Sequence, residues 1–211
     1  MSLTLSAPVV YPSKGSINKY EALQLLLEHD IVKEEDGTPI KFSYGTAGFR
    51  YNAQFMPSVC ARMGMFVALR SIILGQDVGL MITASHNDES YNGIKISDPD
   101  GGMMHPDGEK EAIRIANAAT PREVIDMLQL TQQQPGGQIH VARDTRDHSP
   151  GLSQLVIRAA QSVGATVVDH GRLTTPQLHH IVRHANPHYL PNLIPIRPNA
   201  EGYFELACYS Y

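Results

Sequence analysis

An alternation of short apolar runs with longer helical patterns is the feature that most restricts how this chain of 211 residues can fold. The runs Val78–Ile82, Ile139–Ala142 and Thr166–Asp169 predict buried strands. Apolar residues at helical spacing lie between and around them, for example over residues 58–74 and 149–163. Strands that alternate with helices favour a parallel sheet covered by helices. The sequence therefore predicts an α/β fold, a three-layer α/β/α sandwich with a largely parallel mixed sheet.

Proline and glycine divide the chain into three segments. Residues 1–15 are rich in proline, glycine and serine, and we expect a loose N-terminal segment there. Residues 16–186 carry the alternating pattern and are expected to form one folded domain. Residues 187–211 are interrupted by prolines at 187, 191, 195 and 198. Proline ends regular elements, so the sequence predicts a divergent tail without a long element.

Composition limits the kind of partner. The formal net charge of −4 gives no reason to expect a nucleic-acid partner. No apolar run approaches the roughly 20 residues of a membrane span, so no membrane partner is expected. The two cysteines, Cys60 and Cys208, lie far apart in the sequence. Two thiols without a disulfide framework fit a reducing compartment, and the expected location is cytoplasmic. The oligomeric state stays open.

The most informative polar segment follows the strand predicted at Val78–Ile82. It has the sequence T-A-S-H-N at residues 83–87 and continues as N-G-I-K at residues 92–95. A serine on a loop directly after a buried strand is displayed to whatever binds there. Neighbouring hydrogen-bonding groups and a lysine favour an anion on or near the serine oxygen. From these residues alone, an ordinary polar turn is the better interpretation. The candidate residues are Ser85, His86, Asn87, Asn92 and Lys95.

Two further loops have the composition of phosphate sites. In the segment Tyr44–Arg50, two glycines let the backbone approach a ligand, and Arg50 offers a planar fork for phosphate. In the segment Arg143-Asp144-Thr145-Arg146, one arginine can face an anion while Asp144 orients the other. Taken singly, a glycine turn and a solvated charged loop explain these segments equally well.

Together with Thr174–Leu178, these segments resemble motifs of the α-D-phosphohexomutase family. The segment around Ser85 is similar to the family's phosphoserine loop, and residues 143–146 to its Arg-Asp-Thr-Arg loop. In most members the Asp-Thr-Arg loop precedes the phosphoserine loop. Here it follows, as in the branch that acts on N-acetylglucosamine phosphates. The resemblance covers about residues 16–186 and implies the fold of the family's first domain.

The resemblance implies an intramolecular phosphotransferase, an isomerase of carbohydrate metabolism. Ser85 would be a phosphoserine that interconverts N-acetylglucosamine 6-phosphate and N-acetylglucosamine 1-phosphate in UDP-N-acetylglucosamine biosynthesis. Mg²⁺ would bind to Ser85 through its phosphate. Lys95 or Arg50 would help with proton transfer, and Lys95 is preferred because arginine hardly deprotonates. The residues expected to support the loop or bind phosphate are His86, Asn87, Asn92, Arg143, Asp144 and Arg146.

The chain also departs from the family pattern. Asp88 stands where the family usually has proline, which should loosen the loop and place a negative charge near the phosphate. The family's metal loop, sugar loop and substrate-phosphate loop are not found in the sequence. We therefore expect a fragment with little activity by itself. Two alternatives stay open: an inactive module that binds a phosphosugar or the parent enzyme, and a mutase for another hexose phosphate.

Overall fold

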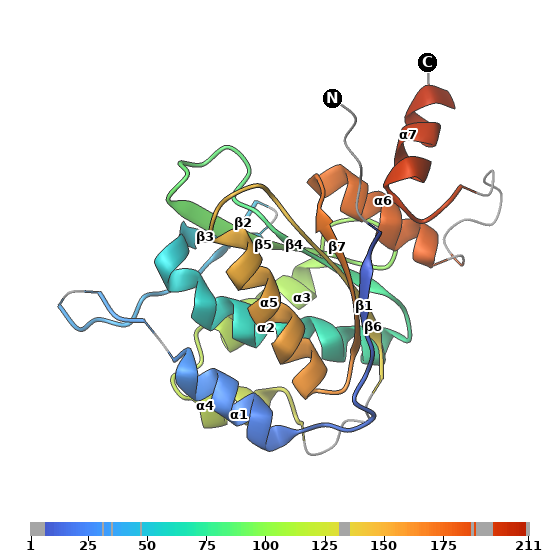
Figure 1. Ribbon diagram of the computed structural model, residues 1–211. Helices are drawn as coiled ribbons and strands as arrows, with labels where there is room; N and C mark the ends of the chain where they lie inside the picture. Colours follow the sequence, from blue (N-terminus) through green and yellow to red (C-terminus); the bar gives the residue numbers. More distant parts are fainter. Residues whose placement is uncertain are drawn as a thin grey trace.

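The computed structural model of the chain describes residues 7–30, 32–34, 36–46, 48–130, 136–186, 188 and 196–209. These residues form a seven-stranded sheet with the order β1-β7-β6-β4-β5-β3-β2 (Figure 1). The strands are β1 (Val9–Tyr11), β2 (Tyr44–Gly45), β3 (Gly48–Asn52), β4 (Val78–Ile82), β5 (Tyr91–Ser97), β6 (Gln138–Arg143) and β7 (Thr166–Arg172).

The helices include one short 3₁₀ turn before the longest helix. They are α1 (Lys19–Glu28), η1 (Ala53–Phe55), α2 (Met56–Leu74), α3 (Pro106–Ala116), α4 (Pro121–Met127), α5 (Ser149–Ser162), α6 (Thr175–Ala185) and α7 (Ala200–Tyr209). Proline stands at the first or second position of α2, α3, α4, α5 and α6. Proline there lacks only an N–H group that a helix would leave unpaired, so it favours a helix start.

The sheet is mixed, and its parallel part is smaller than the sequence predicted. Only the pairs β4–β6 and β6–β7 are parallel among the described strands. The pairs β1–β7, β4–β5, β3–β5 and β2–β3 are antiparallel. The reason lies in the connection from β4 to β5, which is a loop without a crossover helix. Such a connection returns the chain antiparallel to the strand it has just left.

Helices cover both faces of the sheet, so the three-layer α/β/α prediction is confirmed. All five residues of β4 are buried, and successive side chains point to opposite faces. Leu80 and Ile82 belong to the large core formed with α2 and α5. Met81 belongs to a smaller core with Leu178 and Ile181 of α6. Each face of this strand therefore contributes to a different apolar cluster.

Helix α2 is the centre of the larger core. Most of its side chains are buried, including that of Arg62. By length and composition, the stretch Ala53–Leu74 is apolar enough to cross a membrane, which the sequence analysis had not recognised. However, 72% of its most apolar window is buried inside the molecule. This burial is also the pattern of a core helix, so α2 gives only weak evidence for a membrane span.

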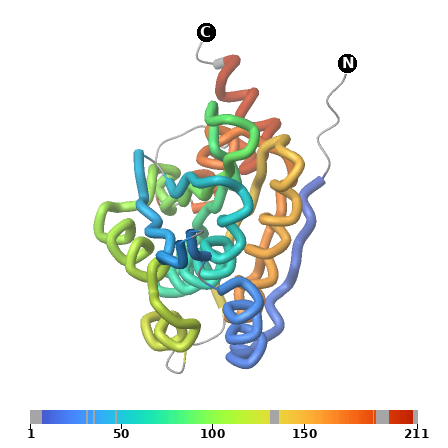
Figure 2. The backbone as a smooth tube through the Cα atoms, turned by 90° about the vertical axis from the view of Figure 1, so that its left-hand side faces the viewer, coloured from blue at the N-terminus to red at the C-terminus, as the bar shows by residue number. Residues whose placement is uncertain are grey.

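The described parts of the two terminal segments contain regular elements that the sequence did not indicate. The segment predicted to be loose, residues 1–15, contains β1, which pairs with β7 through Val9↔Asp169. The tail contains α7, whose Ala200 is buried in the α6 cluster. Figure 2 shows α7 in red at the same end of the molecule as the green loop that joins β4 to β5. The tail prediction for residues 187 and 189–195 lies outside the described residues, and the domain bounds stay a prediction.

Candidate functional site

The three predicted loops meet at one end of the sheet. Strands β4 and β6 are parallel neighbours, and Ile82 pairs with Arg143 at their carboxyl ends. The backbone N–H of Asp144 donates to the carbonyl of Ile82 at 3.0 Å. The chain after β4 and the chain after β6 therefore leave the sheet side by side. Ligand sites of open α/β sheets commonly lie outside such carboxyl ends.

Ser85 has an unusual backbone conformation. Its φ angle is 56°, in the left-handed region that residues other than glycine rarely adopt. Its N–H donates to Thr83 Oγ1 at 3.0 Å, and the Thr83 N–H donates to the Gly93 carbonyl at 3.0 Å. These bonds hold the turn, whose strain costs on the order of 1–3 kcal/mol. The Ser85 residue is exposed beyond the buried end of β4.

Lys95 contacts the serine directly. Its Nζ donates to Ser85 Oγ at 2.9 Å. Burial lowers the pKa of Lys95 from its usual range, and the nearby positive charge of Arg50 lowers that pKa further. The lysine therefore releases a proton more readily than an ordinary surface lysine. A lysine in this state is suited to moving a proton at the serine oxygen.

Gly93 allows Arg50 to lie close to this pair. Arg50 on β3 pairs with Gly93 on β5. A side chain at position 93 would place its Cβ 2.2 Å from the Phe49 carbonyl oxygen and 3.1 Å from Arg50 Cγ. Arg50 Nη2 donates to the Thr46 carbonyl at 2.6 Å, which turns part of its guanidinium toward the glycine loop. Gly93 is therefore a steric requirement of the site.

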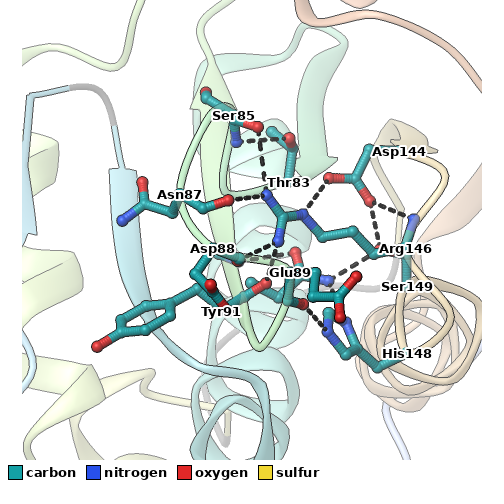
Figure 3. A network of polar contacts seen from close by, with 12 residues as sticks. Thr83, Ser85, Asn87, Asp88, Glu89, Tyr91, Asp144, Arg146, His148 and Ser149 are labelled. Carbon is teal, nitrogen blue, oxygen red and sulfur yellow. Dashed lines mark hydrogen bonds and ion pairs between the residues drawn. The ribbon is translucent and has the colours of Figure 1, made fainter.

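Arg146 extends its guanidinium into the serine loop, between Ser85 on one side and Asp88 and Tyr91 on the other, as Figure 3 shows. Its Nη2 donates to the carbonyls of Ser85 at 3.2 Å and Asn87 at 2.8 Å. Its Nη1 donates to the carbonyls of Asp88 at 2.5 Å and Tyr91 at 2.9 Å. All four acceptors are backbone groups of one loop, so the two terminal nitrogens are already engaged. Of the two predicted roles, this geometry supports loop support rather than phosphate binding.

Asp144 completes the Arg146 arrangement. Its Oδ2 accepts from Arg146 Nε at 3.2 Å, and its Oδ1 accepts from Ser149 Oγ at 2.5 Å. Asp144 therefore orients an arginine, as the sequence predicted for one arginine of this segment. It also ties the loop after β6 to the first residue of α5.

A second set of hydrogen bonds fixes the serine loop through Asn92. The Gly93 N–H donates to Asn92 Oδ1 at 2.8 Å, which sets the orientation of the amide. Its Nδ2 then donates to Ser149 Oγ and to His148 Nδ1, both at 2.8 Å. His148 must therefore carry its proton on Nε2, which donates to the Glu89 carbonyl at 3.0 Å. Sequence reasoning missed His148, because it lies outside every motif.

The side chains of His86 and Asn87 do less than the sequence predicted. His86 is exposed, and neither side chain makes a hydrogen bond within the described part of the chain. Asn87 contributes through its backbone, since its N–H donates to the Ala84 carbonyl at 3.1 Å and its own carbonyl binds Arg146. The loop support that the structure shows here therefore comes from the main chain of Asn87.

The expectation that Asp88 loosens the loop is wrong. Asp88 Oδ1 accepts from the Ser90 N–H at 2.9 Å and from Ser90 Oγ at 2.7 Å. These hydrogen bonds, and then the charge of Arg146, lower the pKa of Asp88. Aspartate commonly closes a turn by bonding the backbone two residues on. Asp88 therefore orders the turn in which proline was expected.

A cavity of about 640 Å³ lies beside the serine. Ser85, Arg143 and Asp144 line it, which brings together two of the predicted loops. Arg172 at the end of β7 and Phe204 of α7 also line it. The sequence analysis assigned no role to these last two residues, since nothing in their local pattern places them near Ser85.

The comparisons with known proteins agree with this geometry. The sequence matches the family described as phosphoglucomutase/phosphomannomutase, alpha/beta/alpha domain I, over residues 44–123 and 124–194. The chain belongs to this family. The match begins at the glycine loop before β3 and includes the serine loop and the Arg143–Arg146 segment. The α/β/α description also agrees with the three layers of this phosphohexomutase domain.

Individual relatives indicate which branch of the family the chain is most similar to. The chain is 42% identical over 158 residues to phosphoacetylglucosamine mutase of Arabidopsis thaliana, covering 70% of this chain and 28% of that protein. It is 39% identical over 173 residues to the Homo sapiens enzyme of the same name, covering 80% of this chain and 30% of that protein. The chain therefore spans less than one third of the length of these relatives.

Solved structures show the same likeness. The substrate complex of an N-acetylglucosamine-phosphate mutase superposes with a TM-score of 0.74 and 34% identity, covering 89% of this chain and 35% of that one. Aspergillus fumigatus N-acetylphosphoglucosamine mutase, in complex with GlcNAc-6P and magnesium, gives a TM-score of 0.74 and 29% identity. That match covers 90% of this chain and 34% of the other.

Magnesium does not fit this phosphohexomutase domain by itself. Mg²⁺ requires near-octahedral oxygen ligation. Within the described residues, no group of three or more histidine, cysteine, aspartate or glutamate side chains is placed to hold a metal ion. The groups next to Ser85 are cationic, and Asp144 is engaged by Arg146 and Ser149. Among the described residues around Ser85, a metal ion would find an oxygen ligand in the serine itself if it were phosphorylated, and the other ligands would have to come from elsewhere.

Proposed function

We propose that Ser85 is the phosphoryl carrier of a phosphoacetylglucosamine mutase, which interconverts N-acetylglucosamine 6-phosphate and N-acetylglucosamine 1-phosphate. The observation that carries the proposal is the 2.9 Å contact from Lys95 Nζ to Ser85 Oγ, on a loop held by Arg146. The relatives named phosphoacetylglucosamine mutase support the choice of sugar. The chain spans under one third of the length of these relatives, so their activity is proposed for it here.

The phosphoryl transfer occurs in two half-reactions. First, the bond from phosphorus to Ser85 Oγ breaks, and a bond from phosphorus to a sugar hydroxyl oxygen forms. The sugar hydroxyl loses its proton, and Ser85 Oγ takes one up. Then Ser85 Oγ attacks the other phosphate of the sugar bisphosphate and releases the isomeric monophosphate. Lys95 is within hydrogen-bond distance of Ser85 Oγ, so it passes the proton released by the sugar hydroxyl to Ser85 Oγ in the first half. In the second half it passes the proton of Ser85 Oγ to the sugar oxygen that leaves phosphorus.

The positive groups near Ser85 also stabilise the charge that develops during transfer. A phosphoserine carries about −1.5 to −2 charges at neutral pH. Lys95 contacts the serine, Arg50 acts electrostatically on Lys95, and Arg143 lines the same cavity as Ser85. Preorganised charges of this kind lower the barrier without reorganising during the reaction. A magnesium ion would bind the Ser85 phosphate with ligands from outside this chain.

A second candidate is a binding module without turnover. The observation that favours this candidate is that the described residues offer no complete magnesium site. Such a module would bind the phosphosugar or the parent enzyme. A cytoplasmic location is part of both candidates, supported by the free thiols of Cys60 and Cys208.

The decisive experiment measures phosphorylation and turnover separately. The chain is incubated with glucose 1,6-bisphosphate, and intact mass reports the addition of one phosphoryl group. A coupled assay then measures formation of N-acetylglucosamine 1-phosphate from the 6-phosphate. Loss of both signals in Ser85→Ala, but not in the loop control Ser90→Ala, supports the proposal. Modification that persists in Ser85→Ala would overturn it.

Two further outcomes separate the alternatives. Phosphorylation of Ser85 without turnover supports the carrier role but leaves the mutase reaction dependent on further domains. Ligand binding without phosphorylation overturns the carrier role and supports the binding module. Faster turnover with glucose or mannose 6-phosphate than with the amino sugar would contradict the assigned substrate and indicate another hexose-phosphate mutase.

A further inference from the structure

Two unpaired arginines lie side by side in the cavity next to Ser85. Arg143 ends β6 and Arg172 ends β7, and the two residues are partners across these strands. Both line the cavity. Neither guanidinium makes a hydrogen bond or ion pair within the part of the chain that the structure describes. Two like charges at neighbouring positions repel each other, so an anion between them would stabilise the arrangement.

No carboxylate in the cavity neutralises this pair. Asp144 lines the cavity too, but its two oxygens accept hydrogen bonds from Arg146 and Ser149. At the start of α6, Gln177 Oε1 accepts from the Thr174 N–H at 2.8 Å, so this helix end is already capped. The two arginines therefore provide the positive charge, and the helix end is not needed for the site.

The cavity also has apolar lining residues, one of which comes from α7. They include Phe204, Leu173 and Met81, and Phe204 is 52% exposed. Helix α7 is held on α6 by ring contact between Tyr203 and His180, with centroids 5.8 Å apart. Ala200 packs in the same apolar cluster as Met81 and Leu173. Phe204 is thus presented to the cavity by an anchored helix.

We propose that Arg143 and Arg172 bind the phosphate of a monophosphorylated amino sugar, whose nonpolar ring face packs against Phe204. The volume of about 640 Å³ lies within the usual size of small-molecule sites, roughly 300–1,000 Å³. A phosphate matches the planar forks of two arginines, and an aromatic ring matches the C–H face of a pyranose. The inference rests on the proposed function only for the sugar that is bound and for the orientation of a sugar hydroxyl toward Ser85.

The test measures binding in the absence of phosphoryl transfer. All chains carry Ser85→Ala, and calorimetry measures the affinity for N-acetylglucosamine 6-phosphate. Arg172→Gln should weaken binding roughly 10-fold or more, since it removes a charge-assisted hydrogen bond. Arg172→Lys should recover part of the affinity because it keeps the charge. The matched control is Arg122→Gln, which makes the same charge change on α4, away from the cavity.

The sugar contact is tested separately. Phe204→Ala should weaken binding of N-acetylglucosamine 6-phosphate but not of inorganic phosphate, because only the sugar has a ring face. Circular dichroism checks that α7 and the rest of the fold persist in each variant. Equal affinities of the Arg172→Gln and Arg122→Gln chains would overturn the inference, as would affinity for the unphosphorylated sugar equal to that for its phosphate.

These outcomes are independent of the carrier role of Ser85. Binding that depends on Arg172, in a chain whose wild-type serine never accepts a phosphoryl group, supports this site and rejects the proposed function. Phosphorylation of Ser85 together with Arg172-independent binding supports the proposed function and rejects this site.

Discussion

Two arginines each donate hydrogen bonds to several backbone carbonyls, in very different regions of the molecule. Arg62 lies in the core with 0% of its side chain exposed, and its Nη1 donates to the carbonyls of Ile115, Ala116 and Ala118 at the end of α3. Arg146 lies under the surface loop after β4 and donates to four carbonyls there. Both guanidiniums bind the carbonyls of a chain segment, one in the core and the other at the surface.

The difference is in how completely each guanidinium is satisfied. Among the described residues, Arg62 Nε and Nη2 have no hydrogen-bond partner, and Asp30 Oδ1 lies 3.9 Å from Nη2. Burial lowers the pKa of Arg62, while Asp30 and Glu123 raise it. Arg146 uses both terminal nitrogens and Nε. In the core, Arg62 bonds the end of a helix although two of its guanidinium nitrogens lack acceptors. In the loop, Arg146 has acceptors for all three nitrogens, and these bonds fix the position of Ser85.

The largest expected effect is on stability, from Arg62→Ala. The change opens a cavity in the core and removes a buried donor shared by three carbonyls at and just after the end of α3, so the free energy of unfolding should fall by about 3 kcal/mol or more. Urea unfolding measures it. The control Arg158→Ala removes an exposed pair with Glu28, at 3.9 Å, and should change stability by less than about 1 kcal/mol. Equal losses in the two variants would contradict the distinction between core and surface.

Acid should act through a third region, because neither arginine loses its charge in acid. Burial, and then the neighbouring His140, lowers the pKa of His170 to about 3. Between that value and the ordinary 6.5, the unfolded chain binds a proton that the folded chain does not. Stability should therefore fall as the pH decreases through this window, by at most about 1.4 kcal/mol per pH unit. The urea midpoint of unfolding should depend less on pH in His170→Gln than in the wild type. An unchanged pH dependence would show that His170 is not the cause of the loss of stability.

Arg146→Ala should have a smaller effect on stability and a specific effect on the serine. The loop carbonyls that it frees can bond to water, so the free energy of unfolding should fall by about 1–2 kcal/mol. The rate of Ser85 phosphorylation should fall roughly 100-fold, because the loop no longer holds the serine in place. Intact mass against time measures this rate. A phosphorylation rate in Arg146→Ala equal to that of the wild type would show that the hydrogen bonds of Arg146 do not position Ser85.

The smallest expected effect concerns Lys95. Removing the charge of Arg50 in Arg50→Gln should raise the pKa of Lys95 only in part, because burial is the larger cause of its lowered pKa. The pH dependence of acylation at Lys95, followed by peptide mass, measures the shift. A pKa that stays unchanged or moves down would show that Arg50 does not act on the lysine.

The fold was largely accessible to sequence reasoning where elements depend on local pattern. Strand β4 and helix α5 follow from apolar runs and helical spacing. Strand β1 was missed because it exists through pairing with β7, far along the chain. Helix α7 was missed because the prolines before it dominated the interpretation. A signal was present in Asn199, whose Oδ1 accepts from the Gly202 N–H at 2.8 Å near the helix start.

The candidate site divides in the same way. The motif around Ser85 predicted Lys95 beside the serine, and the structure gives that contact. The roles of His148, Arg172 and Phe204 depend on three separate elements reaching one place, and no local spacing encodes such a meeting. The expectation for Asp88 failed because it was based on the absence of proline, whereas the side chain closes the turn itself.

The sequence by itself determined the chemistry available to this chain: a serine after a buried strand, a lysine on the next strand, and arginines in two loops. The tertiary structure decided which arginine does what. Arg143 and Arg146 belong to one four-residue motif, yet Arg143 lines the cavity while Arg146 lies under the loop. The physical reason is that each side chain follows the direction of its own backbone, and among the described residues it is Arg146 that meets acceptors, which come from the distant loop after β4.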